Sequence, residues 1–158
     1  DQKQIPDYFV AKTTADTYPT QGHVIPRFFW NNKLEFLNLG LGFCVLIGSE
    51  QETQQKLDKV ASIAFSSCPC DDGKFLEIGI ETFEPYKGYG FGPIAAIHMI
   101  DHCLENGITP VWACRYENVA SYKVALKIGF EVEKLLPYYK LCGKERVLET
   151  LNVDGSSE

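Results

Sequence analysis

The apolar and polar positions of this chain follow two periods, which predict a mixed α/β fold. Short apolar runs at residues 43–47, 60–65 and 74–82 have the length and β-branched content of strands. Later apolar positions recur at helical spacing in residues 93–106 and 118–128. Strands that come first and then alternate with helices predict a mixed α/β sheet.

Helix ends carry their own signals. Residues 26–39 begin with a proline and are predicted as a short helix. Gly107 is suited to the end of the 93–106 helix, and Asn118 and Gly129 are suited to cap the last helix at its two ends. The apolar stripe of the 93–106 helix is expected to face inwards, and it comprises Ile94, Ile97, Met99, Ile100, Cys103 and Leu104.

The chain of 158 residues is long enough for one domain with a core of its own. Residues 1–25 are polar without a sustained period, and we expect a loosely structured lead-in. The domain itself is predicted to span residues 26–147, followed by a polar tail at residues 148–158.

Three short apolar segments complete the expected sheet. Residues 111–114 are predicted to form a short buried strand. Residues 130–136 and 138–142 are predicted to form a closing β-pair around Pro137.

Charge and composition exclude several partners. The net charge of −6 argues against nucleic-acid binding, which needs a basic surface, and it fits an amine-bearing substrate as well as simple solubility. No apolar run approaches the roughly 20 residues that span a bilayer, and we expect no membrane association. The first residues show neither an initiator methionine nor a signal-peptide core. A cytoplasmic location is predicted because the cysteines are expected to be reduced.

The six cysteines are expected to be reduced thiols, because four of them lie inside apolar strand or helix patterns. Cys68-Pro-Cys70 lacks zinc spacing and a second Cys or His pair. The polar stripe of the 93–106 helix is interpreted as a solvated face, so no metal site is predicted; its members are His98, Asp101, His102 and Glu105.

A glycine-rich turn at residues 84–92 joins an apolar strand to a helix that starts at Pro93. The first N–H groups of a helix have no acceptor within it, and the helix dipole favours negative charge there. Glycines allow positive φ and close approach of the backbone to a ligand. The turn is therefore a candidate phosphate-binding loop, with an ordinary strand–helix connection as the alternative.

Three segments together resemble the GCN5-related N-acetyltransferase (GNAT) superfamily, and in particular a less-characterised acetyltransferase branch. Lys87-Gly-Tyr-Gly-Phe-Gly92 is similar to the family's acyl-CoA loop, with Lys87 where arginine or glutamine is usual. Asn118-Val-Ala-Ser121, followed by Lys127-Ile-Gly-Phe130, resembles the family's later helix. The third segment is the strand Glu77-Ile-Gly-Ile-Glu-Thr82. The resemblance implies a GNAT-like α/β fold, with a central mixed, mostly antiparallel β-sheet that has splayed strands and is flanked by helices.

The resemblance also implies an enzyme that transfers an acetyl group from acetyl-CoA to an amine of a small molecule or peptide. The cofactor would lie where the strand at residues 76–82 parts from that at residues 111–114. Backbone groups of Ile80 and Thr82 would hold the pantetheine arm, and Asn118 would be a pantetheine ligand, an N-cap or both. The amides of the loop would hold the pyrophosphate, and they belong to Lys87, Gly88, Tyr89, Gly90, Phe91 and Gly92.

Candidate catalytic groups are less sharply defined. Glu77 and Glu81 lie at alternate positions of the strand and therefore share one of its faces. Each is a candidate base, and the alternative for each is an exposed carboxylate without a catalytic role. Many relatives have a tyrosine that acts as the acid where this chain has Ala125. The resemblance to branches with the Asn-x-x-Ser pattern implies that the Ser121 hydroxyl lies near the sulfur as the acid, with helix capping as its alternative role; the neighbouring Tyr122 is the less favoured candidate. If neither hydroxyl serves, the enzyme would release the thiolate without a protein acid, or the chain would be a non-catalytic acyl-CoA-binding or regulatory module. The acceptor and the oligomeric state, a homodimer included, stay open.

Overall fold

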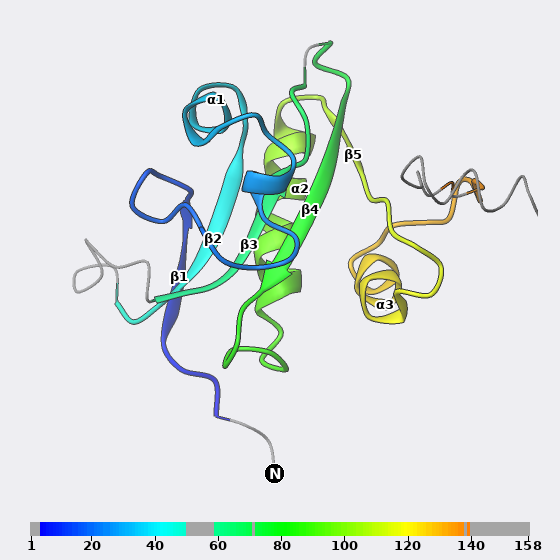
Figure 1. Cartoon of the computed structure of the whole chain (residues 1–158). Coiled ribbons are helices and arrows are strands. Elements are labelled where there is room, and N and C mark those ends of the chain that lie inside the picture. The colour runs from blue at the N-terminus through cyan, green and yellow to red at the C-terminus, as the bar shows by residue number, and fades with distance from the viewer. Residues whose placement is uncertain (1–3, 50–58, 71, 138, 140–158) are drawn as a thin grey trace, which may run out of the picture.

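The computed structural model describes residues 4–49, 59–70, 72–137 and 139. Its centre is one five-stranded sheet in the order β1-β2-β3-β4-β5 (Figure 1). Neighbouring strands are antiparallel from β1 to β4, and β4 and β5 are parallel. The strands are β1 (Tyr8–Lys12), β2 (Gly42–Ile47), β3 (Val60–Ser66), β4 (Phe75–Thr82) and β5 (Thr109–Val111).

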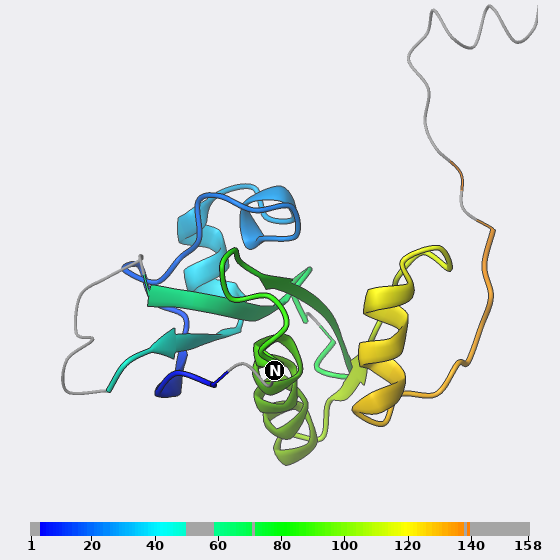
Figure 2. The ribbon, with the colours of Figure 1, turned by 90° about the horizontal axis from the view of Figure 1, so that it is seen from below.

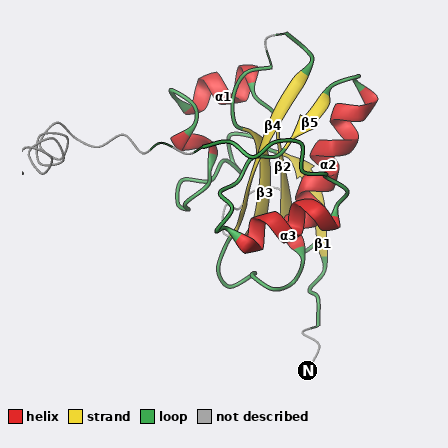
Figure 3. Cartoon of the chain, turned by 90° about the vertical axis from the view of Figure 1, so that its right-hand side faces the viewer, coloured by secondary structure: helices red, strands yellow, loops and turns green. Residues whose placement is uncertain are grey.

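Helices flank both faces of the sheet, as predicted for a mixed α/β fold. The 3-10 helix η1 (Pro26–Phe28) and α1 (Lys33–Leu39) cover one face, and α2 (Phe91–Glu105) covers the other (Figure 2). Helix α3 (Val119–Lys127) lies on the β5 side of the sheet (Figure 3). No helix in the described part of the chain is long and apolar enough to cross a membrane.

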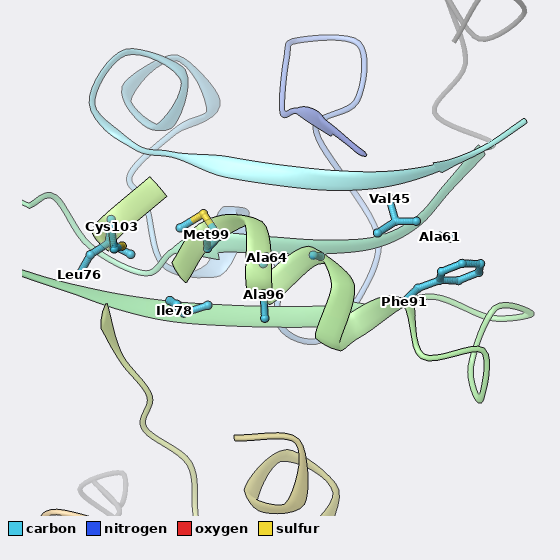
Figure 4. Packing of buried hydrophobic residues seen from close by; sticks show 10 residues of the cluster. Val45, Ala61, Ala64, Leu76, Ile78, Phe91, Ala96, Met99 and Cys103 are labelled. Carbon is cyan, nitrogen blue, oxygen red and sulfur yellow. The ribbon is translucent and has the colours of Figure 1, made fainter. Parts of the chain in front are cut away.

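The first layer of the core lies between α2 and the sheet (Figure 4). Ala95 and Ala96 of α2 are fully buried, and their small side chains allow the helix to approach the strands closely. The buried residues of this layer are Val45, Ala61, Ala64, Leu76, Ile78, Phe91, Ala95, Ala96, Met99 and Cys103.

The second layer lies on the opposite face and is largely aromatic. Phe36 of α1 contacts Trp30 and Phe65, with ring centroids 5.5 and 6.4 Å apart respectively. The Trp30 indole N–H donates to the Ser66 carbonyl at 2.8 Å, so its polar atom is satisfied inside the core. The members of this layer are Tyr18, Trp30, Phe36, Cys44, Leu46, Val60, Ile63 and Phe65.

The N-terminal segment differs from the expected loose lead-in. Residues 8–12 form β1 at the edge of the sheet, and Tyr8 to Lys12 pair in register with Ile47 to Phe43. Tyr18 and Ile25 are buried in the protein. Because β1 is short and only half-buried, its apolar alternation is too weak to recognise without its partner strand.

The predicted 26–39 helix is also divided in two. Asn32 caps a new helix, since its side chain accepts the Glu35 N–H at 2.8 Å. The Glu35 carboxylate in turn accepts the Asn31 N–H at 2.9 Å. The first bond satisfies one of the free donors of α1 and the second holds the residue before the cap, so α1 begins separately from η1.

The C-terminal strand predictions need two corrections. Strand β5 covers residues 109–111 rather than the predicted 111–114, and it is only partly buried; it ends where its pairing with β4 ends. Residues 130–137 form no strand, and residues 131–137 are exposed. Residues 138 and 140–142, the other half of the expected closing pair, lie outside the described residues.

Candidate functional site

Strands β4 and β5 separate part of the way along β4. Their parallel pairing joins residues 75–77 to residues 109–111 and ends there. Strand β4 itself continues to Thr82. The stretch from Ile78 to Thr82 therefore has β3 on one side and no described strand on the other. Figure 1 shows β4 continuing beyond the end of β5 towards the loop that leads into α2.

Some backbone groups of this stretch point towards the edge of β4 along which β5 no longer pairs. The Phe83 N–H donates to the Ala61 carbonyl at 2.9 Å, which directs that peptide group towards β3. Peptide groups alternate in direction along an antiparallel strand, so those of Ile80 and Thr82 are directed to the opposite side. Ile80 and Thr82 thus present backbone donors and acceptors that no strand in the described part of the chain takes up.

The glycine turn between β4 and α2 meets two distinct physical needs. Gly88 and Gly90 have φ of +85° and +83°, the left-handed region that favours glycine. Gly92 lies inside α2, where an added Cβ would be 2.9 Å from Cδ1 of Ile80 and 3.0 Å from Oγ1 of Thr82. The start of α2 therefore packs directly on the end of β4, next to the backbone groups just described.

Helix α2 begins at Phe91 after Gly90, which has no side chain to cap it. The first amides of the helix have no helical acceptor and lie at its positive end. Phe91 is fully buried, and the Tyr89 ring stacks on it at 5.7 Å. The Lys87 ammonium lies 3.0 Å from the Glu84 carboxylate, and this contact raises the pKa of Lys87. The loop thus combines a buried anchor, helix-start amides that have no acceptor within the helix, and a cation paired to Glu84.

The two candidate carboxylates lie on one face of β4 but in different surroundings. Glu77 is exposed and lies where β5 still pairs with β4. Glu81 is half-buried, lies on the stretch beyond that pairing, and accepts the Val24 N–H at 2.9 Å through Oε2. Gly79 between them leaves room for the Phe65 ring, whose Cζ would be 2.6 Å from an added Cβ. Of the two, Glu81 is the carboxylate on the stretch where β4 has no β5 partner, whereas Glu77 belongs to the last residue pair of β4 and β5.

The first turn of α3 places Ser121 beside the end of β5. Asn118 is the N-cap, since its Oδ1 accepts the Ser121 N–H at 3.2 Å. The Ser121 hydroxyl therefore does not cap the helix. Instead its Oγ lies 3.0 Å from the indole nitrogen of Trp112, which follows β5 directly. Ala125, where relatives carry tyrosine, is buried.

Two contacts of these residues are not predicted by the sequence. Trp112 lies at the second position of the predicted 111–114 strand, and Val24 lies in the predicted lead-in. The Val24–Glu81 bond joins positions 57 apart in the sequence, for which no local signal exists. A signal for Trp112 did exist, because an indole N–H that is partly buried needs an acceptor.

Other features of the structure lie away from this site. A surface hollow of about 250 Å³ includes Lys12, Cys70, Leu76 and His102, and none of the predicted site residues lines it. Among the described residues, no group of three or more His, Cys, Asp or Glu is placed to hold a metal ion. The five cysteines within the described residues are unpaired thiols: Cys44, Cys68, Cys70, Cys103 and Cys114.

The sheet with parting strands, the glycine turn and the Asn-capped helix define a GNAT-like fold. A family model described as GNAT acetyltransferase matches residues 10–139. The chain belongs to this family, which confirms the resemblance drawn from the sequence motifs.

Similar proteins extend beyond this chain. It is 33% identical over 112 residues to YdfB, an uncharacterised N-acetyltransferase of Bacillus subtilis (strain 168), covering 70% of this chain and 39% of YdfB. A crystal structure of a GCN5-related N-acetyltransferase-like protein from Streptococcus suis 89/1591 matches with a TM-score of 0.62 and 25% identity, over 80% of this chain and 47% of that one. The chain thus spans less than half the length of these two proteins.

A third match has the same fold at lower identity. It is the microcin C7 self-immunity acetyltransferase MccE, in complex with acetyl-CoA and AMP. The TM-score is 0.53 and the identity 21%, over 68% of this chain and 57% of that one.

Proposed function

We propose that this chain is the catalytic part of an N-acetyltransferase that transfers an acetyl group from acetyl-CoA to an amine of a small molecule or peptide. One observation carries the proposal: β4 loses its β5 partner at the stretch whose backbone groups adjoin the glycine turn and the start of α2. Family membership supports the same reaction class.

The residues present suit acetyl-CoA. An extended chain with amide groups, such as the pantetheine arm, can add to an open strand edge through backbone hydrogen bonds, here those of Ile80 and Thr82. A pyrophosphate suits the amides of residues 87–92 at the positive end of α2. Lys87 adds positive charge at this loop, although it is shared with Glu84.

In the proposed reaction, the neutral amine attacks the carbonyl carbon of the thioester. A C–N bond forms and the C–S bond breaks, and its electron pair leaves on the sulfur. The nitrogen releases a proton to the base, and the thiolate of CoA takes up a proton through solvent to become the free thiol. Glu81 is the proposed base because it lies beyond the β4–β5 pairing, whereas Glu77 lies within it. Ser121 is proposed to donate a hydrogen bond to the departing sulfur.

A non-catalytic acyl-CoA-binding module is the second candidate, and the buried Ala125 in place of the family's tyrosine favours it. A thiol-release assay with acetyl-CoA and a panel of small and peptide amines, combined with calorimetric titration of acetyl-CoA, separates the two. Amine-dependent release supports the enzyme. Binding without release across the panel supports the binding module, and absence of binding refutes both.

A further inference from the structure

We infer that Trp112 is a positioning residue that sets the direction in which the Ser121 hydroxyl donates its proton. This inference rests on the proposed function, because it assigns Ser121 to the departing sulfur. Trp112 belongs to none of the three sequence segments that carry the family resemblance.

The chemistry of the two groups determines which of them donates in the Trp112–Ser121 hydrogen bond. An indole N–H donates a hydrogen bond and cannot accept one, whereas a serine hydroxyl has one proton to donate and two lone pairs. In the 3.0 Å contact, Ser121 Oγ must therefore be the acceptor. Its own proton stays available for a different partner.

The usual local role of a serine in a first helical turn is taken by another residue. Asn118 already accepts the Ser121 N–H at 3.2 Å and caps α3. Within the described residues, no hydrogen bond uses the Ser121 hydroxyl proton. The hydroxyl is thus held from one side by Trp112 and can donate towards a ligand.

The indole is itself held firmly enough to act as a fixed donor. Trp112 packs against the core layer under α2, and its ring lies 5.6 Å from that of Phe130. It also follows β5 directly, at the point where the pairing with β4 ends. The contact therefore links the start of α3 to the place where the strands part.

Kinetics of four single variants and one double variant test the assignment. Trp112→Phe keeps an aromatic ring and removes the N–H donor. We expect kcat for thiol release to fall roughly 2- to 12-fold, the range of one net hydrogen bond, while the Kd for acetyl-CoA stays within about twofold. In the Ser121→Ala background, Trp112→Phe should cause no further loss, because the group it orients is gone. Ser121→Thr, which keeps a hydroxyl, should retain activity. Tyr122→Phe removes a neighbouring hydroxyl of α3 and should leave kcat unchanged.

Two kinetic outcomes would overturn the inference. One is an unchanged kcat in Trp112→Phe. The other is an equal loss with and without Ser121, which would mean that the ring only supports the fold. A fall in kcat for Tyr122→Phe comparable to that for Ser121→Ala would move the acid to Tyr122 and also overturn it.

A spectroscopic experiment on the full chain does not depend on turnover. The chain has two tryptophans, and the Trp30 N–H, bonded to the Ser66 carbonyl, is an internal control. In ¹⁵N-labelled protein, Ser121→Ala should shift the indole signal of Trp112 and not that of Trp30, and acetyl-CoA should do the same in the wild-type chain. If the wild type releases no thiol, the proposed function fails, and the acetyl-CoA titration still decides the inference. An unmoved Trp112 signal in either experiment refutes it.

Discussion

Gly79 offers a direct test of how β4 is packed beneath the aromatic layer. A Cβ added at this position would lie 2.6 Å from Cζ and 2.8 Å from Cε1 of Phe65. Carbon atoms in good contact are roughly 3.5–4.0 Å apart, so either the ring or the strand must move by about 1 Å. Phe65 is fully buried, and its ring centroid lies 5.4 Å from that of Phe29 and 6.4 Å from that of Phe36. Its ring therefore has little room to move. Gly79→Ala should therefore destabilise the fold by about 1–3 kcal/mol, the usual cost of overpacking.

Urea unfolding followed by circular dichroism measures this change as a lower free energy of unfolding. Phe65→Leu removes the ring that causes the clash. The double variant should therefore be less destabilised than the sum of the two single variants, by about 1 kcal/mol or more. Phe91→Leu, a buried ring on the α2 side of the sheet, is the matched control and should be additive with Gly79→Ala.

Two results would refute the reasoning. If Gly79→Ala unfolds at the wild-type urea concentration, the ring does not confine this position. If its cycle with Phe65→Leu is additive within about 0.5 kcal/mol, the cost does not arise from this contact.

Three further predictions concern the loop, a buried thiol and the base. Gly90 has φ +83° and open space around it, so only its backbone conformation restricts a substitution there. Gly90→Ala should weaken acetyl-CoA binding by about 5- to 30-fold in calorimetry, whereas Gly90→Asn, since asparagine tolerates positive φ better, should lose less affinity. Equal losses of affinity would exclude a conformational cause. Burial raises the pKa of the Cys44 thiol from 9.0 to about 11, so the unfolded chain loses this proton at a lower pH than the folded chain does. The free energy of unfolding should therefore fall as the pH rises through that interval. In urea unfolding at the same pH values, Cys44→Ala should show a smaller fall, and an identical fall would contradict the assignment. Glu81→Gln should lower kcat for thiol release by about 100-fold or more, and Glu77→Gln, its matched control, by much less; the reverse order would make Glu77 the base.

The elements that the sequence predicted well carry strong local signals. Strands β3 and β4 are found within one residue of their predicted ends. Asn118 caps α3 as predicted, because the capping bond reaches only three residues along the chain. Helix α2 begins at Phe91, two residues before the predicted start at Pro93, because Gly90 in the left-handed region forms its N-cap.

Predictions that needed knowledge of a neighbouring element were less accurate. The inward stripe of α2 was expected to contain Ile97 and Leu104, which are 44% and 64% exposed. The buried face instead includes Ala95 and Ala96, since close packing on the sheet favours small side chains there. Hydrophobicity alone does not show how near the sheet lies.

The candidate site divides in the same way. The glycine turn and the Asn118–Ser121 segment are visible in the sequence because each is a short local motif. The bond from Trp112 to Ser121 and that from Val24 to Glu81 join separate elements, and only the folded chain brings them together.

By itself the sequence determined the order of β2, β3, β4, α2 and α3, the glycine turn and the cap of α3, since these follow from side-chain periodicity and backbone preferences over a few residues. The tertiary structure alone decided that β1 joins the sheet, where β5 leaves β4, which carboxylate lies beyond that point and which donor holds Ser121. Those features depend on strand register and on packing between elements distant in the chain, which local preferences do not specify.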